Sequence, residues 1–103
     1  MAKAVFVVRA VVPSDLRDQF DRWYADDHLP WALRAFRCGK AWRCWSSLDR
    51  TMHYAFYEFA DELAMDAALA APEFKNLIAD FDRNFPTVTR TRDRLVLAQE
   101  LTR

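Results

Sequence analysis

The chain is organised around residues 20–33, which read FDRWYADDHLPWAL. These fourteen positions hold four aromatic side chains, three aspartates, a proline and one of the two histidines of the protein. The segment therefore combines groups that exchange protons with groups that contact apolar ligands. We expect the functional site to lie here.

The residues before this segment predict a strand. Residues 3–12 read KAVFVVRAVV and are apolar at both odd and even positions. This pattern is typical of a strand that is covered on both faces. Pro13 ends the strand, and Ser14 is a residue type that favours the start of a helix.

From residue 15 the apolar period changes from that of a strand to that of a helix. Leu16, Phe20 and Trp23 are spaced i, i+4 and i+7 and so share one helical face. Pro30 cannot donate a helical hydrogen bond and disfavours helical backbone at the residue before it. We expect a break or kink at residues 28–30, followed by a short turn through residues 31–36.

The rest of the chain predicts a hairpin, a second helical region and a last strand. Residues 40–48 and 52–60 are rich in aromatic side chains and flank a short polar connection, which is typical of a hairpin. A helix capped by Asp61 follows, is divided by Pro72 and continues to residue 85. Residues 87–101 predict the final strand.

This order, βαββαβ, predicts a ferredoxin-like α+β fold over residues 1–103 as a single domain. Its four-stranded antiparallel sheet carries both helical segments on one face. The other face is apolar here, because the first and third strands are apolar at both parities. A bare apolar sheet requires a partner, so we predict a homodimer, with two sheets face to face in a dimeric α/β barrel.

Composition and charge exclude several classes of function. Fifteen basic and fifteen acidic residues cancel, so nothing predicts attraction to nucleic acid or to an anionic membrane. A cluster at Arg90, Arg92 and Arg94 is interpreted as one solvated face of a strand. The sequence has no run long enough to span a membrane and no secretory leader, and Cys38 and Cys44 predict free thiols, so we expect a cytoplasmic protein.

Tyr24, Asp27 and His28 are the candidate catalytic residues. Tyr24 and His28 are four apart and share a helical face. A histidine can transfer protons near neutral pH, a nearby carboxylate can orient it, and a phenol can donate to a developing oxyanion. On spacing alone, the alternative is that His28 only ends the helix and bonds to backbone groups at the Pro30 break.

Other residues are candidates for binding a small hydrophobic or aromatic ligand. Arg9 interrupts an apolar strand, so it either pairs with a carboxylate at the rim or faces an acidic ligand. Trp42, Trp45, Tyr54 and Tyr57 are candidates to line an aromatic cleft, although core and dimer packing are the commoner roles. Trp23 is a further candidate ligand contact. No cofactor is predicted: metal-ligand spacings are absent, and one glycine cannot form a phosphate-binding loop.

The segment WYADDHLPWAL, followed by a glycine and an aromatic strand, resembles the EthD-like branch of the dimeric α/β barrel superfamily. That branch has an aromatic–Tyr pair and then His-Leu-Pro in its first helix. The matching residues are Trp23, Tyr24, His28, Leu29 and Pro30. A Pro-Gly usually precedes the second strand in the family, whereas this chain has Cys38-Gly39.

The resemblance implies a homodimer with a cleft between helices and sheet in each subunit. Relatives in the superfamily include cofactor-free monooxygenases, muconolactone isomerases, polyketide cyclases or dehydratases and haem-degrading enzymes. By analogy, His28 is the acid–base residue and Tyr24 its polar neighbour. The leading hypothesis is a cofactor-independent enzyme of aromatic or polyketide-like metabolism, and the alternative is a non-catalytic protein that binds a small hydrophobic ligand.

Overall fold

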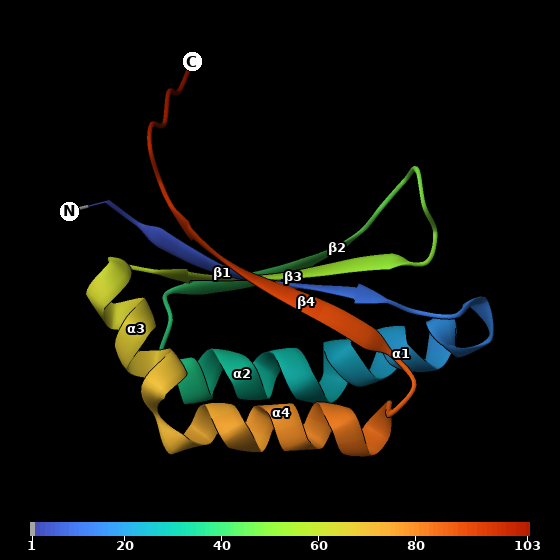
Figure 1. Ribbon diagram of the computed structural model, residues 1–103. Helices are drawn as coiled ribbons and strands as arrows, with labels where there is room; N and C mark the ends of the chain where they lie inside the picture. Colours follow the sequence, from blue (N-terminus) through green and yellow to red (C-terminus); the bar gives the residue numbers. More distant parts are fainter. Residues whose placement is uncertain (1) are drawn as a thin grey trace.

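The computed structural model describes residues 2–103 and shows a sheet with helices packed on one face (Figure 1). The strands are β1 (Ala4–Val11), β2 (Lys40–Trp45), β3 (Met52–Phe59) and β4 (Thr89–Val96). They pair antiparallel in the order β2-β3-β1-β4, so β2 and β4 are the edges. The predicted ferredoxin-like arrangement is confirmed. No helix in the described part of the chain is long and apolar enough to cross a membrane.

The first helical region is longer and more continuous than the sequence predicts. It runs through η1 (Ser14–Leu16), α1 (Arg17–Trp23), η2 (Tyr24–His28) and α2 (Leu29–Phe36). The expected break at residues 28–30 is wrong, because η2 is a π-helical turn in which the N–H of Leu29 donates to the carbonyl of Tyr24. A helix interior normally excludes proline because its ring meets the carbonyl four residues earlier. The widened turn before Pro30 lets the helix continue.

The second helical region consists of α3 (Glu62–Ala70) and α4 (Pro72–Asn84). Asp61 caps α3 as predicted, since its carboxylate accepts a hydrogen bond from the N–H of Ala64 at 2.8 Å. The last strand is shorter than the predicted 87–101. Val96 pairs with Ala4, which is the first residue of β1, so β4 has no strand to pair with beyond Val96.

The two faces of the sheet have different surroundings. Side chains at alternate positions point to opposite faces, and the helices cover only one of them (Figure 1). The covered face carries the buried side chains Phe6, Val8, Ala55 and Tyr57, and the apolar core lies between it and the helices. The open face carries Trp42, Tyr54 and Phe56, whose rings stack on one another, together with Val5, Val7, Arg9 and Val11.

His53 lies in the aromatic part of the core without a hydrogen-bond partner. Its ring is 1% exposed and lies 4.7 to 5.0 Å, centroid to centroid, from the rings of Phe20, Tyr24 and Trp45. Neither ring nitrogen has a partner in residues 2–103. Burial, with a smaller effect from the nearby charge of Arg43, lowers the pKa of His53 from 6.5 to about 3. His53 is therefore neutral in the folded protein.

We predict that His53 lowers the stability of the folded protein as the pH falls below 6.5. In the unfolded chain its pKa returns to 6.5, so between that value and about 3 unfolding takes up a proton. Because of this one group, the free energy of unfolding should then decrease by about 1.4 kcal/mol for each unit by which the pH falls in this range. His53→Phe should flatten the dependence by that amount in urea unfolding between about pH 4 and pH 6. An equal slope in variant and wild type would contradict the assignment.

Candidate functional site

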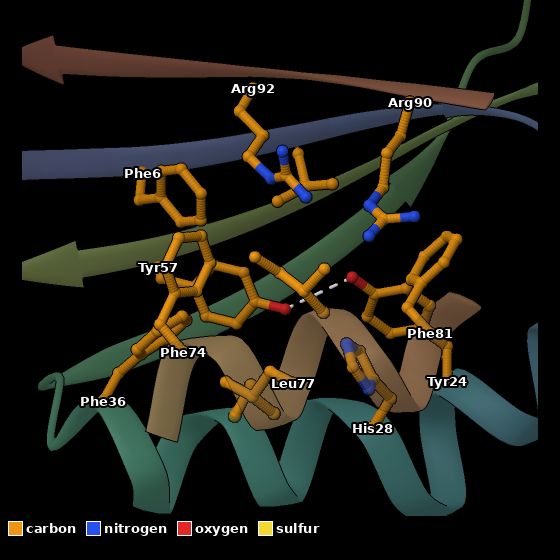
Figure 2. A pocket seen from close by; sticks show the side chains of 13 residues that line it. Phe6, Tyr24, His28, Phe36, Tyr57, Phe74, Leu77, Phe81, Arg90 and Arg92 are labelled. Atoms are coloured by element: carbon orange, nitrogen blue, oxygen red, sulfur yellow. Dashed lines mark hydrogen bonds between the residues drawn. The ribbon is translucent and has the colours of Figure 1, made fainter. Parts of the chain in front are cut away.

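A cavity lies between the covered face of the sheet and the helices (Figure 2). Its empty volume is about 320 Å³, open mouth included. Five of the residues that line it carry polar groups, namely Tyr24, His28, Tyr57, Arg90 and Arg92. The remaining walls are apolar and consist of Phe6, Val8, Ala32, Phe36, Phe74, Leu77, Ile78 and Phe81. An apolar cavity with a few converging polar groups is the usual form of a small-molecule site.

Two tyrosines meet at the centre of the cavity. The hydroxyl oxygen of Tyr24, from the π-helical turn, lies 3.3 Å from that of Tyr57, from β3 (Figure 2). Burial raises the pKa of Tyr24 to about 12 and the pKa of Tyr57 well above its usual value. Both hydroxyls are therefore protonated at neutral pH. One of their two protons lies in the shared hydrogen bond, so the other can be donated to a ligand oxygen.

His28 enters the cavity from the helix and is held by a carboxylate. Its ring is buried, and its Nδ1 lies 3.3 Å from Oδ2 of Asp80 on α4. Burial lowers the pKa of His28, and the hydrogen bond and charge of Asp80 oppose this shift. The ring is therefore neutral at pH 7, with Nδ1–H donating to Asp80. Nε2 then carries the lone pair and is the atom able to accept a proton.

The structure separates Asp27 from the other two candidate catalytic residues. Tyr24 and His28 point inward, whereas Asp27 is exposed on the outer side of the helix. Residues adjacent in a helix point in directions about 100° apart, so a neighbour of a buried residue commonly faces solvent. The carboxylate that contacts His28 is Asp80, which is 52 positions away in sequence. Sequence spacing carries no signal for such a contact.

The predicted ligand-binding residues are divided between the two sides of the sheet. Trp23 lies beside the site, because its ring stacks on that of His28 with centroids 4.5 Å apart. Arg9, Trp42 and Tyr54 lie on the open face and do not line the cavity. Their positions follow from strand parity: Arg9 alternates with Val8, and Tyr54 with Ala55, which face the helices.

Arg90 and Arg92 line the cavity, and the strand face that they share is the one on which the helices lie. Arg92 and Arg94 are exposed, in agreement with the predicted solvated face, whereas Arg90 is not. The side chain of Arg90 is 9% exposed, forms an ion pair with Asp82 at 2.8 Å and lies over the ring of Phe81 at 4.0 Å. Arg90 and Arg92 pair with Ala10 and Val8 of β1, which face the helices. The sequence does not show this register, because it is set only when β1 and β4 pair.

Within the described residues 2–103, no three His, Cys, Asp or Glu side chains lie close enough together to hold a metal ion. Cys38 is buried, Cys44 is exposed on the open face, and both are free thiols.

Comparison with solved structures places this fold among known proteins. A variant of SnoaB, a cofactor-independent oxygenase from Streptomyces nogalater, matches with a TM-score of 0.75 at 18% identity over 98% of each chain. An ethyl tert-butyl ether D (EthD) family protein from Bacillus halodurans matches with a TM-score of 0.66 at 14% identity, over 90% of this chain and 97% of that one. The chain has the fold of these proteins.

A third match is a Nitrosomonas europaea protein of unknown function, with a TM-score of 0.71 at 18% identity over 100% of this chain and 96% of that chain. No protein-family model and no curated protein sequence matches this chain. At such low identities the likeness shows the fold and does not transfer an activity. The presence of an EthD family protein agrees with the resemblance found in residues 23–30.

We predict that Asp80, and not Asp27, controls the protonation of His28. Asp80→Asn removes the charge that opposes the effect of burial, so the pKa of His28 should fall further below its ordinary value. Asp27→Asn changes an exposed side chain and should leave that pKa as it is in the wild type. NMR titration of the His28 ring in both variants makes the comparison. A lowered pKa in the Asp27 variant alone would contradict the contact with Asp80.

Proposed function

We propose that the protein is a cofactor-independent enzyme that acts on a small aromatic or polyketide-like molecule by proton transfer through His28. The observation that carries this proposal is the convergence of a neutral imidazole and a protonated phenol on one apolar cavity. The imidazole is oriented by Asp80, and the phenol of Tyr24 is paired with that of Tyr57. A base and a hydrogen-bond donor are the two groups that proton abstraction beside a carbonyl requires.

The proposed step starts with Nε2 of His28 accepting a proton from a carbon next to a substrate carbonyl. The electron pair of the broken C–H bond moves to the carbonyl oxygen and gives an enolate. A tyrosine hydroxyl then donates a hydrogen bond to this oxygen, and the charge of Arg90 favours the anion. His28 returns the proton at the same or another carbon, so the base is regenerated.

This step is compatible with several reactions of the superfamily. An enolate is an intermediate shared by isomerisation, cyclisation and dehydration, and it is also electron-rich enough to react with dioxygen. The fold of SnoaB, which is a cofactor-independent oxygenase, supports the general kind of chemistry by analogy. The residues of the cavity provide the proton transfer, and the substrate decides which reaction follows.

A binding protein without catalysis is the second candidate. His28 is 5% exposed, stacks on Trp23 and contacts Asp80 of α4, so it also holds the first helical region against α4. In this alternative the same cavity holds a hydrophobic metabolite and His28 has only this structural role.

We predict that His28→Gln strongly slows proton exchange. A panel of small aromatic ketones and phenols in deuterium oxide, followed by NMR, reports the exchange of carbon-bound hydrogen directly. The wild type should catalyse exchange on at least one compound, and His28→Gln should lower its rate about 10²- to 10⁴-fold. Asp26→Asn, on the exposed side of the same turn, is the control and should retain the rate. Unchanged exchange in a folded His28→Gln protein would exclude His28 as the base, and binding without exchange by the wild type would favour the second candidate.

We also propose that the open face of the sheet forms a homodimer. Apolar side chains of β1, β2 and β3 lie together on this face, and Val11 and Leu95 are 44% and 45% exposed on it. The Trp42 and Phe56 rings stack with centroids 5.1 Å apart and present one flat aromatic surface. A contiguous apolar surface of this kind marks a protein interface.

The dimer is tested by Phe56→Glu, which places a charge in the centre of the open face. The wild type should sediment as a dimer at micromolar concentration, and the variant as a monomer. Leu63→Glu is the matched control, because Leu63 is 70% exposed on α3, away from this face. A wild-type monomer at micromolar concentration would refute the proposed interface.

A further inference from the structure

Three arginines project from one side of the edge strand β4 towards the helices. Arg90, Arg92 and Arg94 alternate along the strand and pair with Ala10, Val8 and Phe6 of β1, which fixes their common face. The two outer guanidinium groups have carboxylate partners on the helices. Arg90 pairs with Asp82 of α4, and Arg94 pairs with Asp66 of α3, each at 2.8 Å.

The middle arginine, Arg92, has no such partner. No carboxylate of residues 2–103 lies within 4.0 Å of its guanidinium nitrogens. Its neighbour Asp93 alternates to the other face of the sheet, and the Asp93 carboxylate accepts a hydrogen bond from the backbone N–H of Arg94. Arg92 lines the cavity and is exposed to solvent, and the charge of Asp82 acts on it only from a distance. No ion pair therefore occupies its guanidinium group.

The surroundings of Arg92 favour an anion. Its guanidinium carbon lies 5.7 Å from the ring centroid of Phe74, and Figure 2 shows the side chain projecting from the sheet into the cavity at the end nearer Phe6. Partial burial and the charge of Arg90 lower the pKa of Arg92, which remains positively charged at neutral pH. A guanidinium group binds a carboxylate through two parallel hydrogen bonds.

We propose that Arg92 binds the carboxylate of a small aromatic acid whose ring occupies the apolar cavity. The ring then lies between Phe6 and Phe74 on one side and the Tyr24–His28 pair on the other. The assignment of this acid as a substrate rests on the proposed function, whereas its binding does not. Arg92 is a specificity residue in this proposal, because it selects charge at one end of the ligand while Tyr24 and His28 face the other.

Charge and the lining of the cavity narrow the class of ligand. A single unpaired guanidinium group is balanced by one negative charge, which fits a monocarboxylate better than a phosphate. The aromatic walls formed by Phe6, Phe36 and Phe74 suit an aromatic ring.

The test compares benzoate with benzamide, which has the same shape without the charge. Binding is measured by calorimetry or NMR titration of the full chain. The wild type should prefer benzoate. Arg92→Leu should weaken benzoate binding about ten- to a hundred-fold and leave benzamide binding unchanged, because only the charged hydrogen bonds are lost.

Arg94→Leu is the matched control, since Arg94 lies on the same strand face but is paired and does not line the cavity. It should bind benzoate as the wild type does. Equal affinity of the wild type for benzoate and benzamide, or equal weakening of benzoate binding in both variants, would overturn the anion site.

The same titration in His28→Gln separates this proposal from the catalytic one. Retained benzoate binding with lost proton exchange supports both proposals. Retained binding in a wild type that catalyses no exchange removes the catalytic role and leaves the anion site. Proton exchange that is unaffected by Arg92→Leu, with benzoate binding equally unaffected, removes the anion site and leaves catalysis.

Discussion

One backbone hydrogen bond, from the N–H of Leu29 to the carbonyl of Tyr24, determines the form of the candidate site. It widens a single helical turn just before Pro30, where an unmodified helix would meet the proline ring. Such π-helical turns occur frequently at functional sites. Because the turn absorbs the proline, the helix continues to Phe36 and supplies one wall of the cavity. Tyr24 and His28 face inward from this turn, and Asp27 faces solvent.

The two faces of the sheet have different surroundings. Alternation of side chains sends Phe6, Val8 and Tyr57 towards the helices and sends Arg9, Trp42 and Tyr54 to the open face. The covered face encloses the cavity, and the open face carries the stacked aromatic rings on which the proposed dimer depends. The proposed ligand site and the proposed dimer surface therefore lie on opposite faces of one sheet.

Burial decides the protonation states on which the proposed chemistry depends. The low polarity of the cavity disfavours charge, so His28 is neutral and Tyr24 and Tyr57 keep their protons. Asp80 fixes the orientation of the imidazole and moderates the effect of burial on it. The cavity thus presents a base and a donor at neutral pH, with positive charge from β4 at its sheet-side wall.

The sequence by itself determined the order of elements and the fold, because periods of two and 3.6 residues are local properties of a strand and a helix. It also indicated that Tyr24 and His28 share a helical face. Only the tertiary structure showed that Asp80 contacts His28 and that Tyr57 pairs with Tyr24, since these contacts join residues 52 and 33 positions apart. It likewise decided that Arg90 and Arg92 face the cavity, whereas Arg9, Trp42 and Tyr54 do not. Parity shows which residues of a strand share a face, but the face that the helices cover is decided only when the sheet and helices pack together.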